Sequence, residues 1–174
     1  MDTIKFSGED AITRANQGSM VALQATEYAK QHTRDAGFLS VYSHGNLKAK
    51  KENPFEHPAP YVMDNAQLVF WCFHNAGVTR SGDAEGVNVQ TIRRDPRFKV
   101  ISSEGQKHKG LLNSLEIGDL LFFGTDTTHV ALFAGACDII SMNGSGDWDA
   151  SKGIQISDIT ADYWWSAFNG AVLR

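Results

Sequence analysis

The sequence contains little cysteine. Cys72 and Cys137 are the only two cysteines among 174 residues, too few for a disulfide framework and without the CxxC spacing of a metal knuckle. We expect both thiols to be free and buried, as is usual in a protein kept in a reducing compartment.

Long hydrophobic runs and an excess of positive charge are also missing. No stretch approaches the ~18 apolar residues of a membrane span, so we predict none. The net charge of −4 argues against broad electrostatic binding of nucleic acid. Residues 1–5 lack the basic-then-apolar pattern of a signal peptide, so we expect synthesis in the cytoplasm and, for any export, another route.

Motifs for metals and cofactors are absent as well. The six histidines show no HExxH or comparable spacing. Neither GxGxxG nor GxxxxGK[ST] occurs, so no phosphate loop is indicated. We therefore expect neither a metal nor a cofactor.

The rest of the composition is that of an ordinary globular protein. Hydrophobic residues make up 42% and charged residues 21% of the chain, values that exclude bulk disorder. A chain of this length predicts a single domain over residues 1–174 with a core that needs no disulfide or metal.

Two helices and a long loop are predicted in the first half of the chain. Residues 10–31 carry a broken apolar stripe at helical spacing. Residues 43–60 are polar with three prolines, which indicates a long surface loop. Residues 66–76 are apolar almost all round, so we predict a buried helix, capped by Asp64 or Asn65 and ending at Gly77. A short strand or helical turn is expected at 87–93.

The second half favours strands. Short apolar runs bounded by turn residues predict five of them, at residues 120–123, 129–134, 138–143, 154–156 and 171–173. Helices first and strands later are typical of an α+β fold with a segregated antiparallel sheet.

Three places could carry chemistry. The N-terminus of the buried helix, at Asp64 and Asn65, offers unpaired N–H groups and the positive end of the helix dipole. His129 opens a core strand and can act as a general base. If strands 129–134 and 138–143 form a hairpin, Ser141 or Asn143 could orient the His129 ring. The structural alternatives are an ordinary capped helix, a loop-end histidine and polar strand ends.

These residues resemble the motifs of the NlpC/P60 family of papain-like cysteine peptidases. The family's nucleophile block, usually D-C-S-G-L-V, corresponds to residues 64–69, and its P-G-D-L and H-V-G blocks correspond to residues 117–123 and 129–135. An aromatic cluster at 163–165 precedes Phe168-Asn169-Gly170-Ala171. The resemblance covers residues 60–174.

The resemblance implies a papain-like fold, with helices packed on a small antiparallel sheet. The family cleaves peptide bonds of bacterial peptidoglycan, often next to D-glutamate and diaminopimelate, without a cofactor. It implies that residue 65 is the nucleophile position, His129 the base and Ser141 the third residue, with Asn143 a substitute as in the related CHAP amidases. Without a signal peptide, such an enzyme could be a phage lysin or an injected effector, delivered by lysis or a secretion system.

The sequence departs from the family at the nucleophile. Asn65 replaces the cysteine, and a carboxamide nitrogen, whose lone pair is delocalised, is not a nucleophile for acyl transfer. Cys72 lies seven residues later, ~10 Å along the helix axis, in apolar surroundings that keep a thiol inert. Two hypotheses stay open: a peptidoglycan peptide hydrolase, inactive in this form if Asn65 replaces the nucleophile, and a non-catalytic protein that binds a peptide or a protein partner in the retained groove.

The loops at 43–60 and 144–153 are expected to flank that groove. Lys48, Lys50, Lys51 and His57 make the first loop basic, which would steer carboxylates at low salt; a solvated loop kept for solubility is the alternative. We predict that Trp148 and at least one of Tyr61 and His57 line the cleft with His129. Asp64, next to Asn65, completes the expected set of substrate-binding residues.

Overall fold

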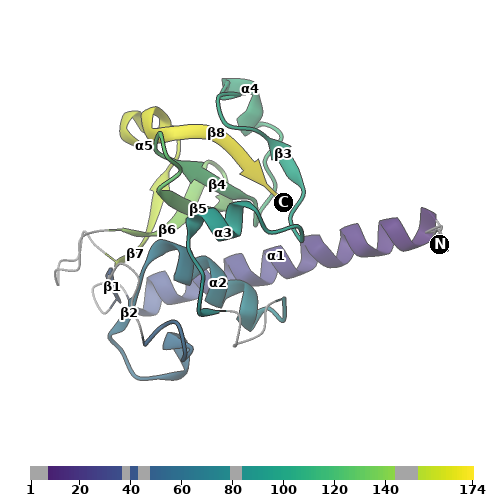
Figure 1. The fold of residues 1–174 in the computed structure, drawn as a ribbon. Coiled ribbons are helices and arrows are strands. Elements are labelled where there is room, and N and C mark those ends of the chain that lie inside the picture. The colour runs from purple at the N-terminus through teal and green to yellow at the C-terminus, as the bar shows by residue number, and fades with distance from the viewer. Residues whose placement is uncertain (1–7, 37–39, 43–47, 79–83, 144–152) are drawn as a thin grey trace.

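A six-stranded antiparallel sheet forms the centre of the computed structural model (Figure 1). The structure describes residues 8–36, 40–42, 48–78, 84–143 and 153–174. The strands lie in the order β3-β8-β4-β5-β6-β7. Their bounds are Val100–Ser102 (β3), Leu120–Phe123 (β4), His129–Gly135 (β5), Asp138–Asn143 (β6), Gly153–Asp158 (β7) and Phe168–Leu173 (β8). The predicted α+β class with a segregated antiparallel sheet is confirmed.

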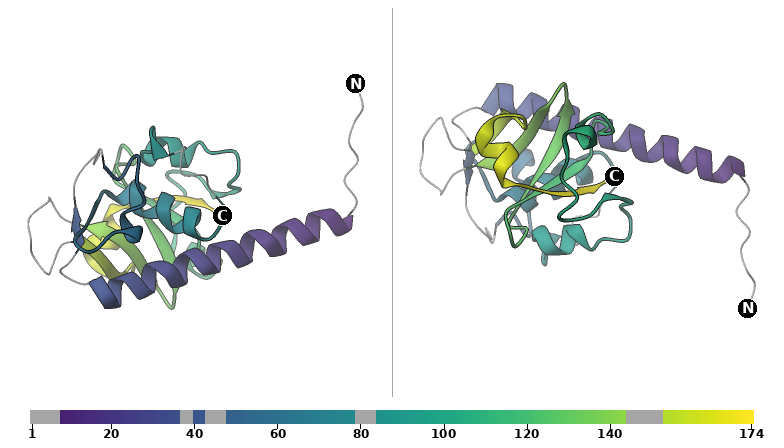
Figure 2. Two further views of the ribbon diagram at one scale, coloured as in Figure 1. Left: turned by 90° about the horizontal axis from the view of Figure 1, so that it is seen from below. Right: turned by 90° about the horizontal axis from the view of Figure 1, so that it is seen from above.

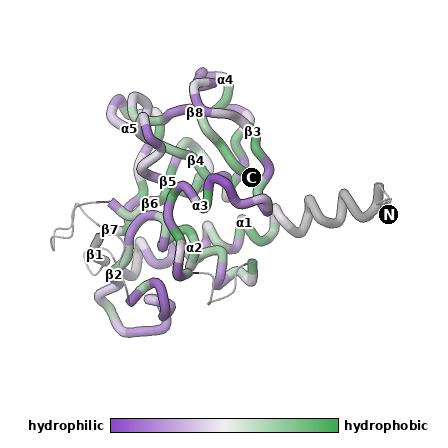
Figure 3. Tube along the Cα trace, in the orientation of Figure 1, coloured by the Kyte–Doolittle hydropathy of each residue, from purple (hydrophilic) through white to green (hydrophobic). Residues whose placement is uncertain are grey.

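Both faces of this sheet are covered, which explains why its strands are continuous apolar runs. In β4, Leu120 and Phe122 belong to a hydrophobic cluster with residues of the helices at 8–36 and 65–75. Leu121 and Phe123 belong to a second cluster, which includes Phe168 and the partly buried Trp164 and Trp165. Figure 3 shows the β4 region as hydrophobic. All four β4 residues are buried, so this strand links the two cores.

Helix α1 (Gly8–Ala36) is longer than the predicted helix at 10–31. The chain offers no proline to end it, and Gly18 is tolerated inside it. Ala25 and Ala29, four residues apart, are fully buried against the core. The N-terminal part of α1 extends beyond the rest of the domain (Figures 1 and 2).

Gly118 brings α1 close to the beginning of β4. Its φ is +95°, and a Cβ at this position would lie 2.2 Å from the Cβ of Ala22 in α1. Only glycine fits both the backbone conformation and the approach of the helix. This contact fixes α1 against the sheet.

Helix α2 (Asn65–Asn75) matches the predicted buried helix to within one residue at each end. Asp64 is the N-cap: its side chain accepts from the Gln67 N–H at 2.8 Å, and the Gln67 side chain accepts from the Asp64 N–H at 3.0 Å. This reciprocal capping box fixes where the helix begins. Asn65 is therefore the first residue of α2, with the next eight residues also buried.

The segment before α2 is more structured than the predicted loop at 43–60. Residues 43–47 lie outside the described part; beyond them Ala49 and Asn53 are buried. Asn53 caps the 3-10 helix η2 (Pro54–Glu56), and the Ala49 carbonyl accepts from Trp71 Nε1 at 2.7 Å. The described part of the predicted surface loop is thus mostly exposed, but these contacts hold it against α2.

Several short elements were not predicted or were left open. β1 (Ser40–Tyr42) pairs in parallel with β2 (Tyr61–Met63). The choice at 87–93 resolves as helix α3 (Val89–Arg93), capped by Asn88. The chain also forms α4 (Lys109–Leu112) and α5 (Asp162–Ala167). None of the described helices combines the length and apolar character that crossing a membrane requires.

Candidate functional site

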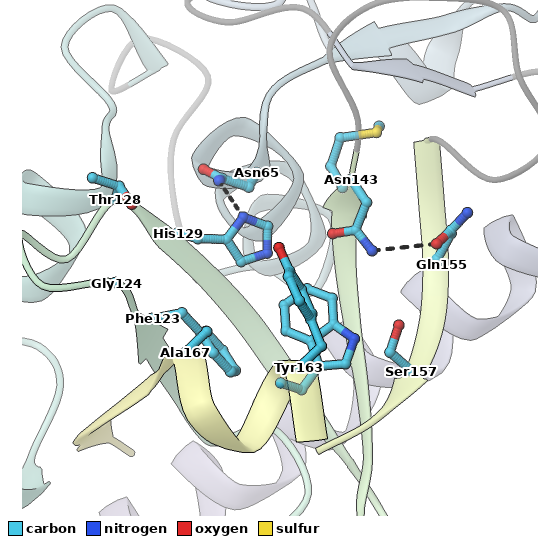
Figure 4. Close-up of a pocket in the computed structure, with 12 residues that line it drawn as sticks. Asn65, Phe123, Gly124, Thr128, His129, Asn143, Gln155, Ser157, Tyr163 and Ala167 are labelled. Atoms are coloured by element: carbon cyan, nitrogen blue, oxygen red, sulfur yellow. Dashed lines mark hydrogen bonds between the residues drawn. The ribbon is translucent and has the colours of Figure 1, made fainter. Parts of the chain in front are cut away.

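Asn65 and His129 are in direct contact. The Asn65 Nδ2 amide lies 2.7 Å from His129 Nδ1, so the first residue of α2 meets the first residue of β5 (Figure 4). The N-terminus of α2 is placed by the Asp64 capping box, and β5 is placed by its pairing with β4, in which Phe123 is opposite His129. The predicted juxtaposition of these two residues is therefore present.

The environment of His129 keeps its ring neutral. Its ring lies 5.8 Å from that of Phe123 and 5.6 Å from that of Trp164, measured between centroids. Burial lowers the pKa of His129 from 6.5 to about 4. Because the Asn65 amide donates to Nδ1, the ring proton of the neutral form is on Nε2.

The Nε2 atom of His129 is buried and has no hydrogen-bond partner among the described residues. In papain-like chemistry a third residue would hold the ring. Within the described ranges, neither Ser141 nor Asn143, the two residues expected in that role, hydrogen-bonds to His129 Nε2. Instead, the Ser141 hydroxyl donates to Asn143 Oδ1 at 2.7 Å, and Asn143 Nδ2 donates to Gln155 Oε1 at 3.3 Å.

Asn65, His129 and Asn143 all line one cleft of about 620 Å³, a volume within the usual range for ligand sites. Figure 4 shows Asn143 and Gln155 across from Asn65 and His129. The cleft is also lined by Phe123, Gly124, Thr128, Met142, Gln155, Ser157, Tyr163, Trp164 and Ala167. Ser141 is 1% exposed and is not among the lining residues that the structure describes, so it positions Asn143 from behind.

The turn that leads into His129 is held by side chains from two other elements. Gln90 of α3 donates to the Asp126 carbonyl at 2.8 Å, and Asn169 of β8 donates to Thr127 Oγ1 at 2.9 Å. Arg93 donates to the same Thr127 hydroxyl. Thr127 is buried with a positive φ of 51°, so these bonds stabilise an uncommon backbone conformation next to the cleft.

Tyr61 and His57 lie elsewhere. Tyr61 packs against Phe55 and His32, with ring centroids 5.4 and 5.7 Å away. His57 lies 3.3 Å from Glu52, beside a separate depression that Lys51 also lines. Neither is among the described residues that line the cleft, because tertiary contacts hold each of them at another place on the domain. The expectation that one of them would line it is wrong.

The remaining predicted residues divide as follows. Asp64 is buried and serves as the helix cap. Trp148 and most of the predicted loop at 144–153 lie outside the described residues. Cys72 is fully buried within α2, and burial raises the pKa of its thiol, as expected for an inert cysteine. Cys137 is only half-buried, because it sits in the β5–β6 turn with a φ of 68°.

Sequence reasoning missed most of the cleft wall. Gln155 and Ser157 alternate with Ile154 and Ile156 in β7, and this period of two was a usable signal for a polar face. Tyr163 and Trp164 belong to the aromatic cluster at 163–165, but no pattern indicated that α5 would bring them beside His129. Among the described residues, no three His, Cys, Asp or Glu side chains gather as a metal site would require.

Comparison with known proteins gives a consistent assignment. A protein from Staphylococcus aureus, described as similar to a lipoprotein of the NLP/P60 family, has 18% sequence identity and a TM-score of 0.55. The superposition covers 99% of this chain and 44% of the Staphylococcus aureus chain. NlpC2 from Trichomonas vaginalis has 13% identity and a TM-score of 0.55, with 90% and 46% covered. The P60 domain of an M. avium subspecies paratuberculosis antigen has 16% identity and a TM-score of 0.51, with 88% and 96% covered.

At these identities the likeness shows the fold, and the chain spans less than half the length of the first two proteins. The sequence model of the NlpC/P60 family matches residues 40–173. The match starts twenty residues earlier than the motifs at 60–174 indicated, since β1 and the segment before α2 belong to the same fold. This chain therefore belongs to the NlpC/P60 family, whose members are typically cell-wall peptidases.

Proposed function

We propose that this protein binds peptidoglycan stem peptides in the cleft above Asn65 without hydrolysing them. The family acts on peptidoglycan peptides, which supports the ligand class. The observation that carries the proposal is the hydrogen bond of 2.7 Å between Asn65 Nδ2 and His129 Nδ1. This contact supports a carboxamide, rather than a thiolate, as the group that faces His129 in the cleft.

The remaining groups in the cleft support binding rather than acyl transfer. With no thiolate at residue 65 to offset the burial that lowers the pKa of His129 to about 4, the native chain has no thiolate–imidazolium pair. Cys72 is fully buried. What the cleft retains is a wall of aromatic side chains facing several amides and hydroxyls, which suits recognition of an extended peptide.

Hydrolysis by this chain, as in a phage lysin or a secreted effector, is the second candidate. The observation that favours it is His129, which still contacts residue 65. A protein partner with an extended segment is the other ligand that the non-catalytic hypothesis allows.

Three proteins separate these functions: the native chain, Asn65→Cys, and Asn65→Cys combined with His129→Ala. Each is first checked for folding by circular dichroism, then incubated with purified peptidoglycan and with soluble stem peptides. We expect the native chain to co-sediment with peptidoglycan and release no fragments. Asn65→Cys should release peptide fragments that mass spectrometry detects, and the added His129→Ala should abolish that release.

Two results would overturn the proposal. Fragment release by the native chain would establish hydrolysis. A native chain that binds neither peptidoglycan nor stem peptides, while Asn65→Cys also fails to cleave, would remove stem peptides as the ligand and leave a protein partner as the alternative.

A further inference from the structure

The described lining of the cleft contains no side chain that is charged at neutral pH. Its hydrogen-bonding groups are carboxamides and hydroxyls, represented by Asn65, Asn143, Ser157 and Tyr163. His129 is neutral because burial lowers its pKa. A cleft of this composition can offer hydrogen bonds but no counter-ion.

The charged residues next to the lining in sequence are all acidic. Among the described residues they are Asp64 beside Asn65, Asp158 beside Ser157 and Asp162 beside Tyr163. Nearby cations are engaged elsewhere: Arg93 pairs with Glu104 at 2.9 Å, and Lys107 donates to the Trp165 carbonyl at 2.8 Å. The lining of the cleft, as far as the structure describes it, is therefore uncharged.

The basic residues of the loop at 43–60 do not supply the missing positive charge to the cleft lining. His57 and Lys51 border a different depression, which Asn53 and Trp71 also line. Lys48 lies 3.8 Å from Glu52. Within the described chain, these basic residues therefore do not line the cleft.

We infer that the cleft binds stem peptides more tightly when the α-carboxyl group of D-glutamate is amidated than when it is a free carboxylate. This inference rests on the proposed function and names its substrate class. A carboxylate entering the cleft loses part of its hydration with no cation among the described lining residues to compensate, which is unfavourable. A carboxamide is uncharged and offers both a donor and an acceptor.

The side chains opposite His129 are prepared for such a group. The Ser141 hydroxyl, donating to Asn143 Oδ1 at 2.7 Å, turns the Asn143 Nδ2 toward Gln155. One carboxamide thus already pairs with another across β6 and β7, as Figure 4 shows. Buried His129 Nε2, without a partner among the described residues, adds a neutral N–H donor at the same site.

The test uses two synthetic tripeptides, L-alanyl-γ-D-glutamyl-diaminopimelate with the α-carboxyl of D-glutamate free or amidated. Affinity for the native chain is measured by calorimetry at pH 7 and physiological salt. We expect the amidated peptide to bind about tenfold more tightly, since roughly 1.4 kcal/mol of uncompensated desolvation corresponds to that ratio. Equal affinities, or tighter binding of the carboxylate, overturn the inference alone. Failure of both peptides to bind overturns the proposed function and the inference with it.

A charge added to the cleft tests the cause. Ser157→Lys places a cation in the lining and should shift the preference toward the free carboxylate by about tenfold. Ile156→Lys is the matched control, because Ile156 is the preceding residue of β7, is 48% exposed and does not line the cleft within the described chain. If Ser157→Lys folds and binds but leaves the preference unchanged, the missing cation is not the source of selectivity, and the inference fails.

Discussion

Asn65 Nδ2 and His129 Nδ1 lie 2.7 Å apart although 64 residues separate them in sequence. The contact holds the imidazole by one nitrogen and assigns the proton of the neutral ring to the other. The Asn65 amide donates its own N–H to Nδ1 and takes up no proton from the ring, so the pair is a fixed hydrogen bond rather than an acid–base couple. A change of the side chain at residue 65 should therefore change the pKa of His129.

Replacing Asn65 by aspartate should change that protonation. In Asn65→Asp a carboxylate would face His129 Nδ1 at hydrogen-bond distance, and an opposite charge at that range favours the protonated ring. We expect the pKa of His129 to rise from about 4 by about one to three pH units. Titration of the His129 ring followed by NMR measures it. Asn113→Asp, at an exposed position outside the cleft lining of the described chain, is the control; a similar rise in both variants would contradict the pairing.

The stability of the protein should fall in mild acid because of His129. Burial lowers its pKa from 6.5 to about 4 in the folded state. Between these values the unfolded chain binds more protons, so the free energy of unfolding rises with pH. As pH falls from about 6.5 toward 4, this group should remove roughly 2 kcal/mol of stability.

Urea unfolding of the native chain and His129→Gln over that pH range isolates the effect. The stability difference between the two proteins should shrink as pH falls, because glutamine does not titrate. Asn113→Gln, which changes an exposed residue that does not titrate, should keep the native pH dependence. Parallel curves for the native chain and His129→Gln would show that burial of His129 has no such effect.

Replacing Gly118 and Gly18 by alanine should change the stability of the protein in opposite directions. Gly118 has a positive φ and its Cβ would meet Ala22 at 2.2 Å, so Gly118→Ala should destabilise the protein by about 3 kcal/mol. Gly18 lies in an exposed part of α1, where an added methyl group would meet nothing within 4 Å. Gly18→Ala should stabilise by about 0.5–1 kcal/mol, through helix propensity. Chemical denaturation of both variants decides; equal effects of one sign would refute the assigned packing of α1.

Arg174 should matter more than an exposed ion pair. It donates to both carboxylate oxygens of Asp119, which is 1% exposed, at 2.8 Å each. Arg174→Ala leaves that buried carboxylate without its cation and should cost about 3 kcal/mol. Lys30→Ala, which breaks a partly exposed pair with Glu27 at 3.2 Å, should change stability by less than about 1 kcal/mol. Equal losses in denaturant melts would mean that Asp119 is solvated.

The elements with strong patterns were predictable from sequence. α2 and strands β4 to β6 combine continuous apolar runs with clear boundaries, such as the cap at Asp64 and the turn at Gly124. β1, β2 and β3 have three residues each, too few for a period to show. They form because distant segments meet, as when Ile154 N–H donates to Ser40 Oγ at 2.8 Å.

The site shows the same division. Asn65 and His129 could be paired because each begins an element whose start was visible in the sequence. Tyr61 and His57 could not be placed, because Tyr61 begins a three-residue strand and His57 directly follows η2, and side-chain directions there depend on tertiary contacts such as that between Tyr61 and Phe55. Tyr163 and Trp164 depend on how α5 folds back onto Phe123, with the rings of Phe123 and Trp164 5.3 Å apart.

The position of β8 sets the order in which the protein can assemble. It is the last strand along the chain, yet it lies between β3 and β4, with Leu173 opposite both Val100 and Leu120. Pairings so distant in sequence form late, because a long loop must be closed first. During synthesis, β4 to β6 can form a meander early, whereas β3 must wait until residues 168–173 leave the ribosome. Since α5 immediately precedes β8 and carries Tyr163 and Trp164, we expect the aromatic wall of the cleft to form only after β8 has paired.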